Sequence, residues 1–457
     1  MELILDLKNL NKQFLGKREW GILNINFDEI NNKINDTTTI YAEGTVSKVI
    51  GLTIEIEGVK AFVGELCKIY NEKNEPINCE VVGFREKNVL LMPLDEVNGI
   101  SAGCKVVPQR RPLDVNCSDE LLGKILDGLG NPYDDIKIKE NIRYPLENEP
   151  PDPLKRRRIK DIMPTGVRAI DGFLTVGEGQ RIGIFAGSGV GKSTTLGMIA
   201  READADVNVI SLIGERGREV LEFIEKDLGP EGMKKSVVVC ATSDKPALIR
   251  LKGALTATAI AEYFRDQGKK VILMMDSVTR YAMAQREVGL AIGEPPATKG
   301  YTPSVFAKLP RLMERAGTSD KGSITAFYTV LVDGDDFNEP IADAVRGILD
   351  GHIVLSRSLA HKNHYPAIDI LNSVSRLMSQ IASDEHKNSA SYARDLLATY
   401  KDSEDMINIG AYARGSNPKI DLAIQYNEPL NKFLRQGIDE KSEFNDSINV
   451  LTSLFNR

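Results

Sequence analysis

The residues with the clearest chemistry lie within positions 182–200, which read IGIFAGSGVGKSTTLGMIA. The apolar run 182–186 predicts a buried strand, and the glycines after it predict a flexible turn that leads into a helix. At such a junction the backbone N–H groups have no internal partner and can surround a polyphosphate. Lys192 adds a positive charge for the terminal phosphates, and Ser193 places a hydroxyl where Mg²⁺ binds. The stretch therefore predicts a nucleoside-triphosphate site.

This stretch meets the phosphate-loop motif G-x-x-x-x-G-K-[ST] except at its first glycine, where Ala186 stands. The exception costs little, because Ala186 would close the strand and the backbone that approaches phosphate begins one residue later. A chance glycine-rich turn is the alternative. The residues that we expect to hold the nucleotide in this loop are Gly187, Ser188, Gly189, Val190, Gly191, Lys192, Ser193 and Thr194.

Asp276 ends the apolar run VILMMD, so a predicted strand would deliver its carboxylate to the edge of a sheet. Its role there would be to hold Mg²⁺, directly or through water, beside Ser193. An aspartate at this place can instead cap a helix, because the helical pattern SVTRYAMAQREV follows. The phosphate loop upstream favours the metal role.

A second charged cluster, GERGREV, follows the predicted strand VNVISLI. Hydrolysis needs a carboxylate that polarises the attacking water, and a second acidic group can orient the water shell of the metal. We assign the first task to Glu215, which is closest to the strand end, and the second to Glu219. Charged residues at a helix start are also commonly solvated, which is the alternative for both.

A third cluster, YPAIDILNSVSRLM, spans positions 365–378. Tyr365 could stack on the base of the nucleotide. Arg376, supplied by a neighbouring subunit, could neutralise the charge that develops as the γ-phosphate leaves. The alternative for Arg376 is an ordinary surface arginine.

The segment from about 166 to 382 must position these residues, and it alternates apolar runs with helical patterns. This alternation predicts a mostly parallel sheet covered by helices, in which ligands bind beyond the carboxyl ends of the strands. The candidate strands are 182–186, 207–213, 236–241, 271–275, 323–332 and 352–355. All the chemically interesting residues follow strand ends.

Before this segment, positions 41–107 show short β-branched runs separated by glycines, with turns about every ten residues. We expect a small closed β-barrel. Such barrels can bind oligonucleotides, but this one carries more acidic than basic residues and few aromatic residues. A structural or assembly role is therefore favoured over RNA binding.

The two ends of the chain and the segment between the expected barrel and sheet show weaker patterns. Leucines and a phenylalanine at helical spacing in the first 20 residues predict a helix that packs on its own domain or docks on a partner protein. The proline-rich stretch 143–165 predicts an extended connection, and its basic run 155–158 is typical of a solvated linker face. Beyond residue 383 we expect a small helical domain, in which Pro429 interrupts a helix over 421–434.

Composition narrows the class of protein. The chain has 457 residues, of which 42% are hydrophobic and 27% charged, so we expect two or three soluble domains. The net charge of −7 argues against a dedicated nucleic-acid binder. Without a signal peptide or a spanning run of roughly 20 apolar residues, a cytoplasmic location is the simplest expectation. The five scattered cysteines argue against disulfides and zinc, and we expect buried thiols.

Together, the motifs AGSGVGKST, GERGREV, DSVTRYAMAQREVGLAIGEPPATKGYTPSVF and YPAIDILNSVSRLM resemble the flagellar and type III secretion export ATPases, relatives of the catalytic subunits of rotary ATP synthases. The resemblance covers nearly the whole chain except about the first 35 residues and the extreme C-terminus. It implies an α/β fold, with a RecA-like P-loop nucleotide domain between an N-terminal β-barrel and a C-terminal helical domain. The expected boundaries are a helical segment over 1–35, the barrel over 36–110, a connection over 111–165, the ATPase domain over 166–382 and the helical domain over 383–457.

The resemblance also implies roles for single residues. Lys192 and Ser193 are similar to the phosphate and magnesium residues of the family, and Asp276 to its metal-linked aspartate. Glu215 matches the carboxylate that activates water, and Arg216 matches a phosphate contact. The remaining two matches are Tyr365, similar to the tyrosine that stacks on adenine, and Arg376, similar to the arginine finger that is given in trans.

The resemblance implies a homohexamer that hydrolyses ATP with Mg²⁺ at the cytoplasmic face of the inner-membrane secretion apparatus, with only peripheral membrane association. Its expected partners are a stator-like regulator, the export gate, export substrates and their chaperones, with no nucleic acid. The phrase AFVGELC favours a flagellar over a virulence system. Two other functions remain as alternatives: a catalytic subunit of a rotary ATP synthase and, less favoured, an RNA-translocating hexamer.

Overall fold

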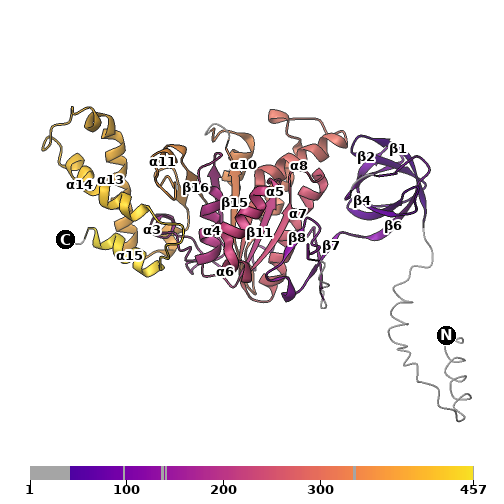
Figure 1. Ribbon diagram of the computed structural model, residues 1–457, viewed down its shortest axis with the longest axis horizontal. Coiled ribbons are helices and arrows are strands. Elements are labelled where there is room, and N and C mark those ends of the chain that lie inside the picture. The colour runs from indigo at the N-terminus through magenta and orange to yellow at the C-terminus, as the bar shows by residue number, and fades with distance from the viewer. Residues whose placement is uncertain (1–41, 96–97, 135–137, 139–141, 333–335, 456–457) are drawn as a thin grey trace, which may run out of the picture. The chain divides into compact units, whose positions relative to one another are not determined.

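The computed structural model describes residues 42–95, 98–134, 138, 142–332 and 336–455 (Figure 1). The helix expected over residues 1–35 lies outside these ranges, and so do residues 36–41 at the start of the expected barrel domain. The remainder forms one compact unit from Glu43 onward. Within the described residues, no helix is both long and apolar enough to cross a membrane.

The first part of this unit is a closed barrel, which confirms the expectation from the glycine-separated runs. Its strands are β1 (Gly44–Ile50), β2 (Thr53–Glu57), β3 (Glu65–Tyr70), β4 (Pro76–Arg85), β5 (Asn88–Pro93) and β6 (Lys105–Pro112). They pair antiparallel in the order β1-β2-β5-β4-β3-β6. Alternate side chains such as Ile54 and Ile56 fill a core of their own inside the barrel.

The second part is a nine-stranded sheet with the path β17-β16-β10-β15-β13-β11-β12-β8, to which β14 adds beside β15. Its strands are β8 (Ile125–Asp127), β10 (Arg181–Ala186), β11 (Val207–Ile213), β12 (Ser236–Ala241), β13 (Lys270–Asp276), β14 (Gly317–Thr318), β15 (Ser323–Leu331), β16 (Gly351–Leu355) and β17 (Val374–Ser375). The central strands are parallel, because helices carry the chain back over the sheet between them.

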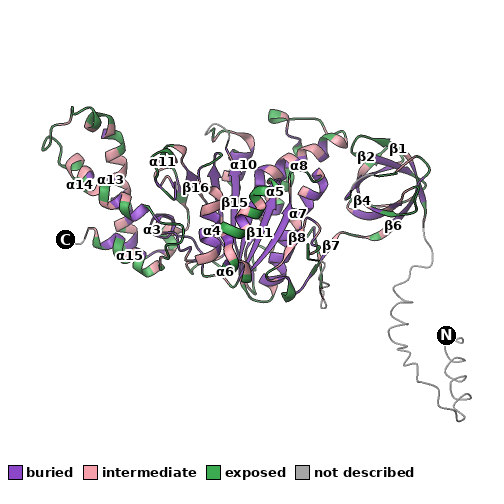
Figure 2. Cartoon of the chain, viewed as in Figure 1, coloured by how far each residue is buried: buried purple, intermediate pink, exposed green. Residues whose placement is uncertain are grey.

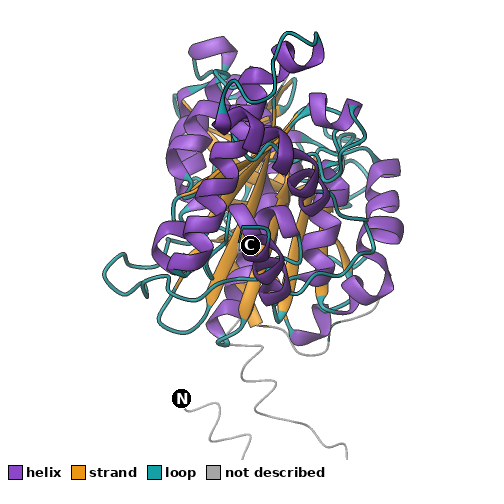
Figure 3. Cartoon of the chain, turned by 90° about the vertical axis from the view of Figure 1, so that its left-hand side faces the viewer, coloured by secondary structure: helices purple, strands orange, loops and turns teal. Residues whose placement is uncertain are grey.

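Helices cover both faces of this sheet, and the strands between them are buried (Figures 2 and 3). Along β10, Phe185 joins the core under the helices of one face, while Ile184 and Ala186 join the core under those of the other. Burial on both faces explains why these strands read as continuous apolar runs. The first face holds α7 (Ala247–Asp266), α8 (Val278–Ala291), α9 (Pro303–Met313) and α10 (Pro340–Ile348), and the second holds α3 (Arg168–Phe173) and α4 (Lys192–Glu202).

Short elements complete the unit. Strands β7 (Asp114–Cys117) and β9 (Ile142–Pro145) form a two-stranded sheet. The short helices are η1 (Asp119–Leu121), α5 (Gly217–Glu222), η2 (Phe223–Leu228), α6 (Gly229–Lys234), η3 (Thr298–Gly300), α11 (Arg357–His361) and α12 (Met378–Ile381). The five cysteines are all buried and free, as expected.

The C-terminal region is helical, as expected, and comprises α13 (Asp384–Asn408), α14 (Pro418–Leu434) and α15 (Phe444–Ser453). The expected interruption at Pro429 is wrong, because α14 runs through this residue. Leu430 and Phe433, just beyond the proline, are buried in the core that these helices share with α3. Their burial outweighs the loss of one backbone hydrogen bond.

The basic run 155–158 is only partly a solvated linker face, because Lys155, Arg157 and Arg158 are exposed but Arg156 is partly buried. Arg156 donates from Nη1 to the carbonyl of Ala316 at 2.8 Å, and only 19% of its side chain is exposed. Arg157 donates to the carbonyl of Lys321 at 3.2 Å. The connection between the barrel and the sheet is therefore fastened along the segment after α9.

A buried ion pair ties the barrel to α7. The ammonium Nζ of Lys252 lies 2.7 Å from Oε2 of Glu80 on β4, and both side chains are less than a tenth exposed. Burial raises the pKa of Glu80, although the charge of Lys252 opposes this effect. Glu147 lies 3.5 Å from the same ammonium but is mostly exposed.

We predict that Lys252→Met lowers the free energy of unfolding by about 3 kcal/mol, because it leaves the Glu80 carboxylate buried without a partner. The double variant Lys252→Met with Glu80→Leu should recover most of this loss, since no charge then remains buried. Thermal unfolding of the wild type and the two variants at one pH measures the effect. A double variant that is no more stable than the single one would contradict this account.

Candidate active site

The phosphate loop lies where β10 ends and α4 begins, as the sequence predicts. Gly189 and Gly191 have φ angles of 76° and 86°, a left-handed region that residues with a Cβ rarely adopt. Gly191 is also the N-cap of α4 and caps it without a side-chain hydrogen bond. The first N–H groups of α4 thus remain available to an anion.

Three charged residues converge beside this loop. Nζ of Lys192 lies 2.5 Å from Oδ1 of Asp276 and 3.5 Å from Oε1 of Glu215. At most 13% of any of these side chains is exposed. They come from the ends of β10, β11 and β13, which reach the same edge of the sheet because the strands are parallel.

The cluster shifts the proton affinities of its members. Burial lowers the pKa of the Lys192 ammonium, but the negative charges of Asp276 and Glu215 raise it by more. The pKa of Lys192 is therefore above its usual value. For Glu215, burial raises the pKa of the carboxyl to about 7; Lys192 lowers it, whereas Asp276 and a hydrogen bond with Glu219 raise it further. A carboxyl with this pKa can exchange a proton near neutral pH.

Asp276 is held in place from β15. Its Oδ1 accepts a hydrogen bond of 2.7 Å from the buried hydroxyl of Thr329. It does not cap the following helix, because Ser277 is the N-cap of α8 and accepts from the N–H of Arg280. The helix-cap alternative for Asp276 is therefore wrong, and its carboxylate points toward Lys192.

The other predicted residues of the charged cluster lie further out. Glu219 is about half exposed and hydrogen-bonded to Glu215. Arg216 is 81% exposed and lies 3.3 Å from Glu219. Both lie at the start of α5.

Tyr365 lies against the phosphate loop although it is far away in the sequence. A Cβ built on Gly191 would lie 3.6 Å from two carbons of the Tyr365 ring. The ring is 41% exposed, so part of it is open to a flat partner. The structure thus brings this residue to the loop, next to the place where a nucleotide would extend.

Arg376 lies at the opposite edge of the sheet. Its N–H donates to the carbonyl of Asp350 at 3.0 Å, immediately before β16. Because Ala186 pairs with Leu355 on that strand, about five residues, or roughly 16 Å, separate Asp350 from the loop edge. The exposed Arg376 side chain is therefore not brought to the phosphate loop of its own chain.

Magnesium fits the oxygen donors at the loop. Among the described residues no group of three or more histidine, cysteine or acidic side chains could hold a metal. Mg²⁺ commonly binds one or two protein oxygens and completes its shell with phosphates and water. The Asp276 carboxylate and the Ser193 hydroxyl supply such oxygens.

Sequence reasoning missed two residues of the site. Thr329 lies inside the predicted strand 323–332, where a threonine is an ordinary strand former. Arg280 on α8 packs over the backbone of Gly214, lowers the pKa of Glu215 by its charge, and has a buried Nε without a hydrogen-bond partner in the described structure. The position of Arg280 in the sequence, about one helical turn after Asp276, could have indicated that it lies near the site.

The fold and the site define a P-loop nucleotide-binding protein with an N-terminal barrel and a C-terminal helical domain. The models of the ATP synthase alpha/beta family match residues 166–375 for the nucleotide-binding domain and 46–109 for the β-barrel domain. The model of the T3SS EscN ATPase C-terminal domain matches residues 382–453.

Comparison with individual relatives shows to which branch of this family the chain is similar. The chain is 59% identical to the flagellum-specific ATP synthase of Bacillus subtilis, over 92% of this chain and 97% of that protein. The assembled ATPase EscN of enteropathogenic E. coli is 49% identical, with a TM-score of 0.86 over 90% of this chain and 99% of that one. EscN in complex with its central stalk EscO is 48% identical, with a TM-score of 0.84 over the same shares. The chain belongs to the family of flagellar and type III secretion export ATPases.

We predict that Thr329→Val lowers kcat by about tenfold or more while nucleotide binding is retained, because Asp276 loses a hydrogen bond to its charged group. Thr325→Val near the start of the same strand is the matched control, since among the described residues the Thr325 hydroxyl accepts from the N–H of Gly179 and does not contact Asp276. Steady-state hydrolysis and binding of a fluorescent ATP analogue measure both variants. Equal rates for the two variants would remove Thr329 from the site.

A pH dependence follows from Glu215. A general base must be ionised, so if Glu215 has the role expected from the sequence, kcat/KM for ATP should rise with pH through about 7, where this carboxyl titrates. Well below that pH the rate should fall by about tenfold per unit. Binding of the fluorescent ATP analogue over the same range serves as the control for titration of the nucleotide. A flat kcat/KM from about pH 5.5 to 8 would exclude Glu215 as the base.

Proposed function

We propose that the chain is a Mg²⁺-dependent ATPase whose hydrolysis energises protein export through a flagellar type III secretion apparatus. The observation that carries the proposal is the convergence of Lys192, Glu215 and Asp276 at the end of the phosphate loop. A cation for phosphate, a carboxylate with a pKa near neutrality and a carboxylate for a metal are the groups that ATP hydrolysis needs.

In this proposal each residue has one task. The N–H groups of residues 187–194 bind the phosphates, and Lys192 exchanges the carboxylate of Asp276 for the terminal phosphates. Asp276 and Ser193 would hold Mg²⁺, which neutralises charge on the phosphates.

The remaining site residues act on the attacking water, the phosphates and the adenine of the nucleotide. Glu215 takes the proton of the attacking water, and Glu219 orients water beside it. Arg216 contacts phosphate from the rim, and Tyr365 stacks on the adenine with its exposed ring.

We also propose that the working form is a homohexamer. Arg376 lies at the sheet edge opposite its own loop, so it can complete only a neighbour's site. A ring of identical chains gives every site one such arginine. This supports a self-sufficient homomer over a rotary ATP synthase subunit, which would need a second, noncatalytic chain.

Membership of the family supports the proposed partners and location. A central stalk is bound to EscN in a solved structure, and we propose a stalk or stator-like regulator, the export gate, export substrates and chaperones for this chain. The place of action is the cytoplasmic face of the inner-membrane apparatus. The high identity to a flagellar protein favours the flagellar system over the virulence alternative. The acidic barrel gives no support to RNA translocation.

We predict that purified Lys192→Ala loses hydrolysis and that Arg376→Ala loses it while still binding ATP. Glu215→Gln should bind ATP and hydrolyse it slower by orders of magnitude, because no base remains. Hydrolysis and binding of the fluorescent ATP analogue measure all three. An Arg376→Ala chain that hydrolyses ATP at the wild-type rate would refute the finger assignment.

In cells, replacing the chain by Lys192→Ala should stop secretion of flagellar subunits and abolish motility. The wild-type chain expressed from a plasmid is the control and should restore both. Motile cells that secrete flagellar subunits normally but fail to secrete virulence proteins would transfer the function to the virulence system.

A further inference from the structure

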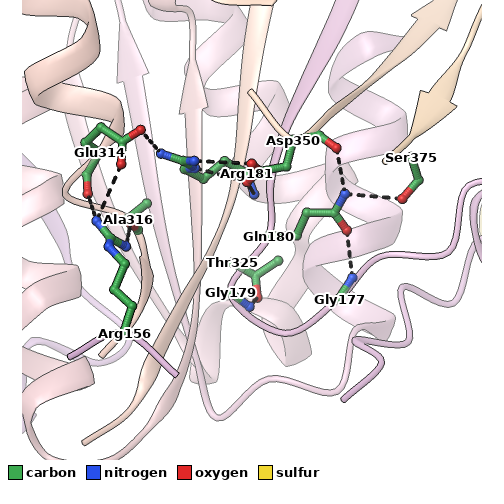
Figure 4. Close-up of polar contacts among 10 residues, drawn as sticks. All are labelled: Arg156, Gly177, Gly179, Gln180, Arg181, Glu314, Ala316, Thr325, Asp350 and Ser375. Carbon is green, nitrogen blue, oxygen red and sulfur yellow. Dashed lines mark hydrogen bonds and ion pairs between the residues drawn. The ribbon is translucent and has the colours of Figure 1, made fainter. Parts of the chain in front are cut away.

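The two ends of strand β10 serve different sites. Its carboxyl end, Ala186, leads into the phosphate loop of the same chain. At its amino end, Gln180 and Arg181 contact Asp350, which precedes β16, and Gln180 also contacts Ser375, the residue before Arg376. Figure 4 shows the polar contacts that join these strands at the amino edge of the sheet.

The link between β10 and β17 is the side chain of Gln180, which is completely buried. Its Nε2 donates to the carbonyl of Asp350 at 3.1 Å and to the hydroxyl of Ser375 at 3.2 Å. Its Oε1 accepts from the N–H of Gly177 at 2.8 Å. The Asp350 carbonyl also accepts from the N–H of Arg376 at 3.0 Å. Gln180 therefore fixes both the residue before Arg376 and the acceptor of the Arg376 backbone.

Asp350 is itself clamped to the first residue of β10. Its carboxylate accepts from Arg181 through the backbone N–H at 3.1 Å, Nε at 3.0 Å and Nη2 at 3.2 Å. Arg181 also pairs with Glu314, which in turn contacts Arg156. Such bidentate pairs fix direction as well as distance.

Between these two ends, β10 is a rigid connection. Its six residues are paired with β15 on one side, and four of them with β16 on the other. A strand that is hydrogen-bonded on both edges and buried on both faces transmits a displacement rather than absorbing it. The strand is therefore suited to fix the position of the loop at one end relative to the arginine at the other.

We propose that Gln180, with Asp350, is a positioning residue for Arg376. Through strand β10, it fixes the position of the arginine that each subunit gives to its neighbour relative to that subunit's own phosphate loop. This inference rests on the proposed role of Arg376 in trans. It predicts that Gln180 acts on the neighbour's hydrolysis and leaves the subunit's own nucleotide binding intact.

The first test separates binding from catalysis. Gln180→Leu should bind the fluorescent ATP analogue with an affinity within about twofold of wild type, whereas kcat falls by about tenfold or more. Ser375→Ala, which removes one acceptor of Gln180, should show a smaller fall of the same kind. The matched control is Thr325→Val, which removes a hydroxyl from the same edge without touching β17 and should leave kcat near wild type. Equal losses in Gln180→Leu and Thr325→Val would make the effect one of general stability and overturn the proposal.

The second test mixes variants within one ring. Gln180→Leu chains keep an intact loop, and Lys192→Ala chains keep an intact Arg376 and its support. In a random mixture about a quarter of the interfaces combine the two intact halves, so hydrolysis should exceed that of either variant alone. If Gln180 served only its own loop, the mixture would gain nothing, and the proposal would fail.

Two further mixtures keep the outcomes distinct. Arg376→Ala mixed with Lys192→Ala should also gain activity, and a lack of gain there would refute the trans arginine itself. Asp276→Asn mixed with Lys192→Ala should gain nothing, because both changes disable the same half of the site. A gain with Arg376→Ala but none with Gln180→Leu would overturn only the role of Gln180.

Discussion

The site depends on one buried interaction, the contact of the Lys192 ammonium with the carboxylates of Asp276 and Glu215. Burying any one of these charges alone would cost several kcal/mol. Only parallel strands that end at one sheet edge bring the three together from distant parts of the chain. The same contact raises the pKa of the Lys192 ammonium, so the lysine keeps its charge although it is buried.

In the proposed function, the opposite edge of the sheet carries the complementary half of a neighbour's site. There Gln180 and Asp350 hold the short strand that ends before Arg376. One sheet thus presents a phosphate loop at its carboxyl edge and an arginine at its amino edge. If Arg376 acts in trans as proposed, the chain completes its catalytic groups only by assembling with copies of itself, and hydrolysis then depends on ring formation.

The sequence alone predicted the barrel and the main strands of the sheet. Strands that are buried on both faces form continuous apolar runs, so the ends of these strands can be placed without knowing which residues pack against them. It could not predict β8, whose three residues join the sheet from the expected connection. It also missed the hydrogen bond from Thr329 to Asp276, the fastening of Arg156, and a helix that runs through Pro429. Each depends on partners that are remote in sequence, and tertiary packing overrides local propensity at such places.

The central claim is that the loop of one subunit and Arg376 of the next form one site. The most direct measurement is a structure of the assembled ring with a transition-state analogue of ATP hydrolysis. The account predicts that Lys192 leaves Asp276 to contact the phosphate mimic and that a neighbour's Arg376 lies within hydrogen-bond distance of the same group. A ring in which that arginine faces solvent, away from every nucleotide, would contradict it.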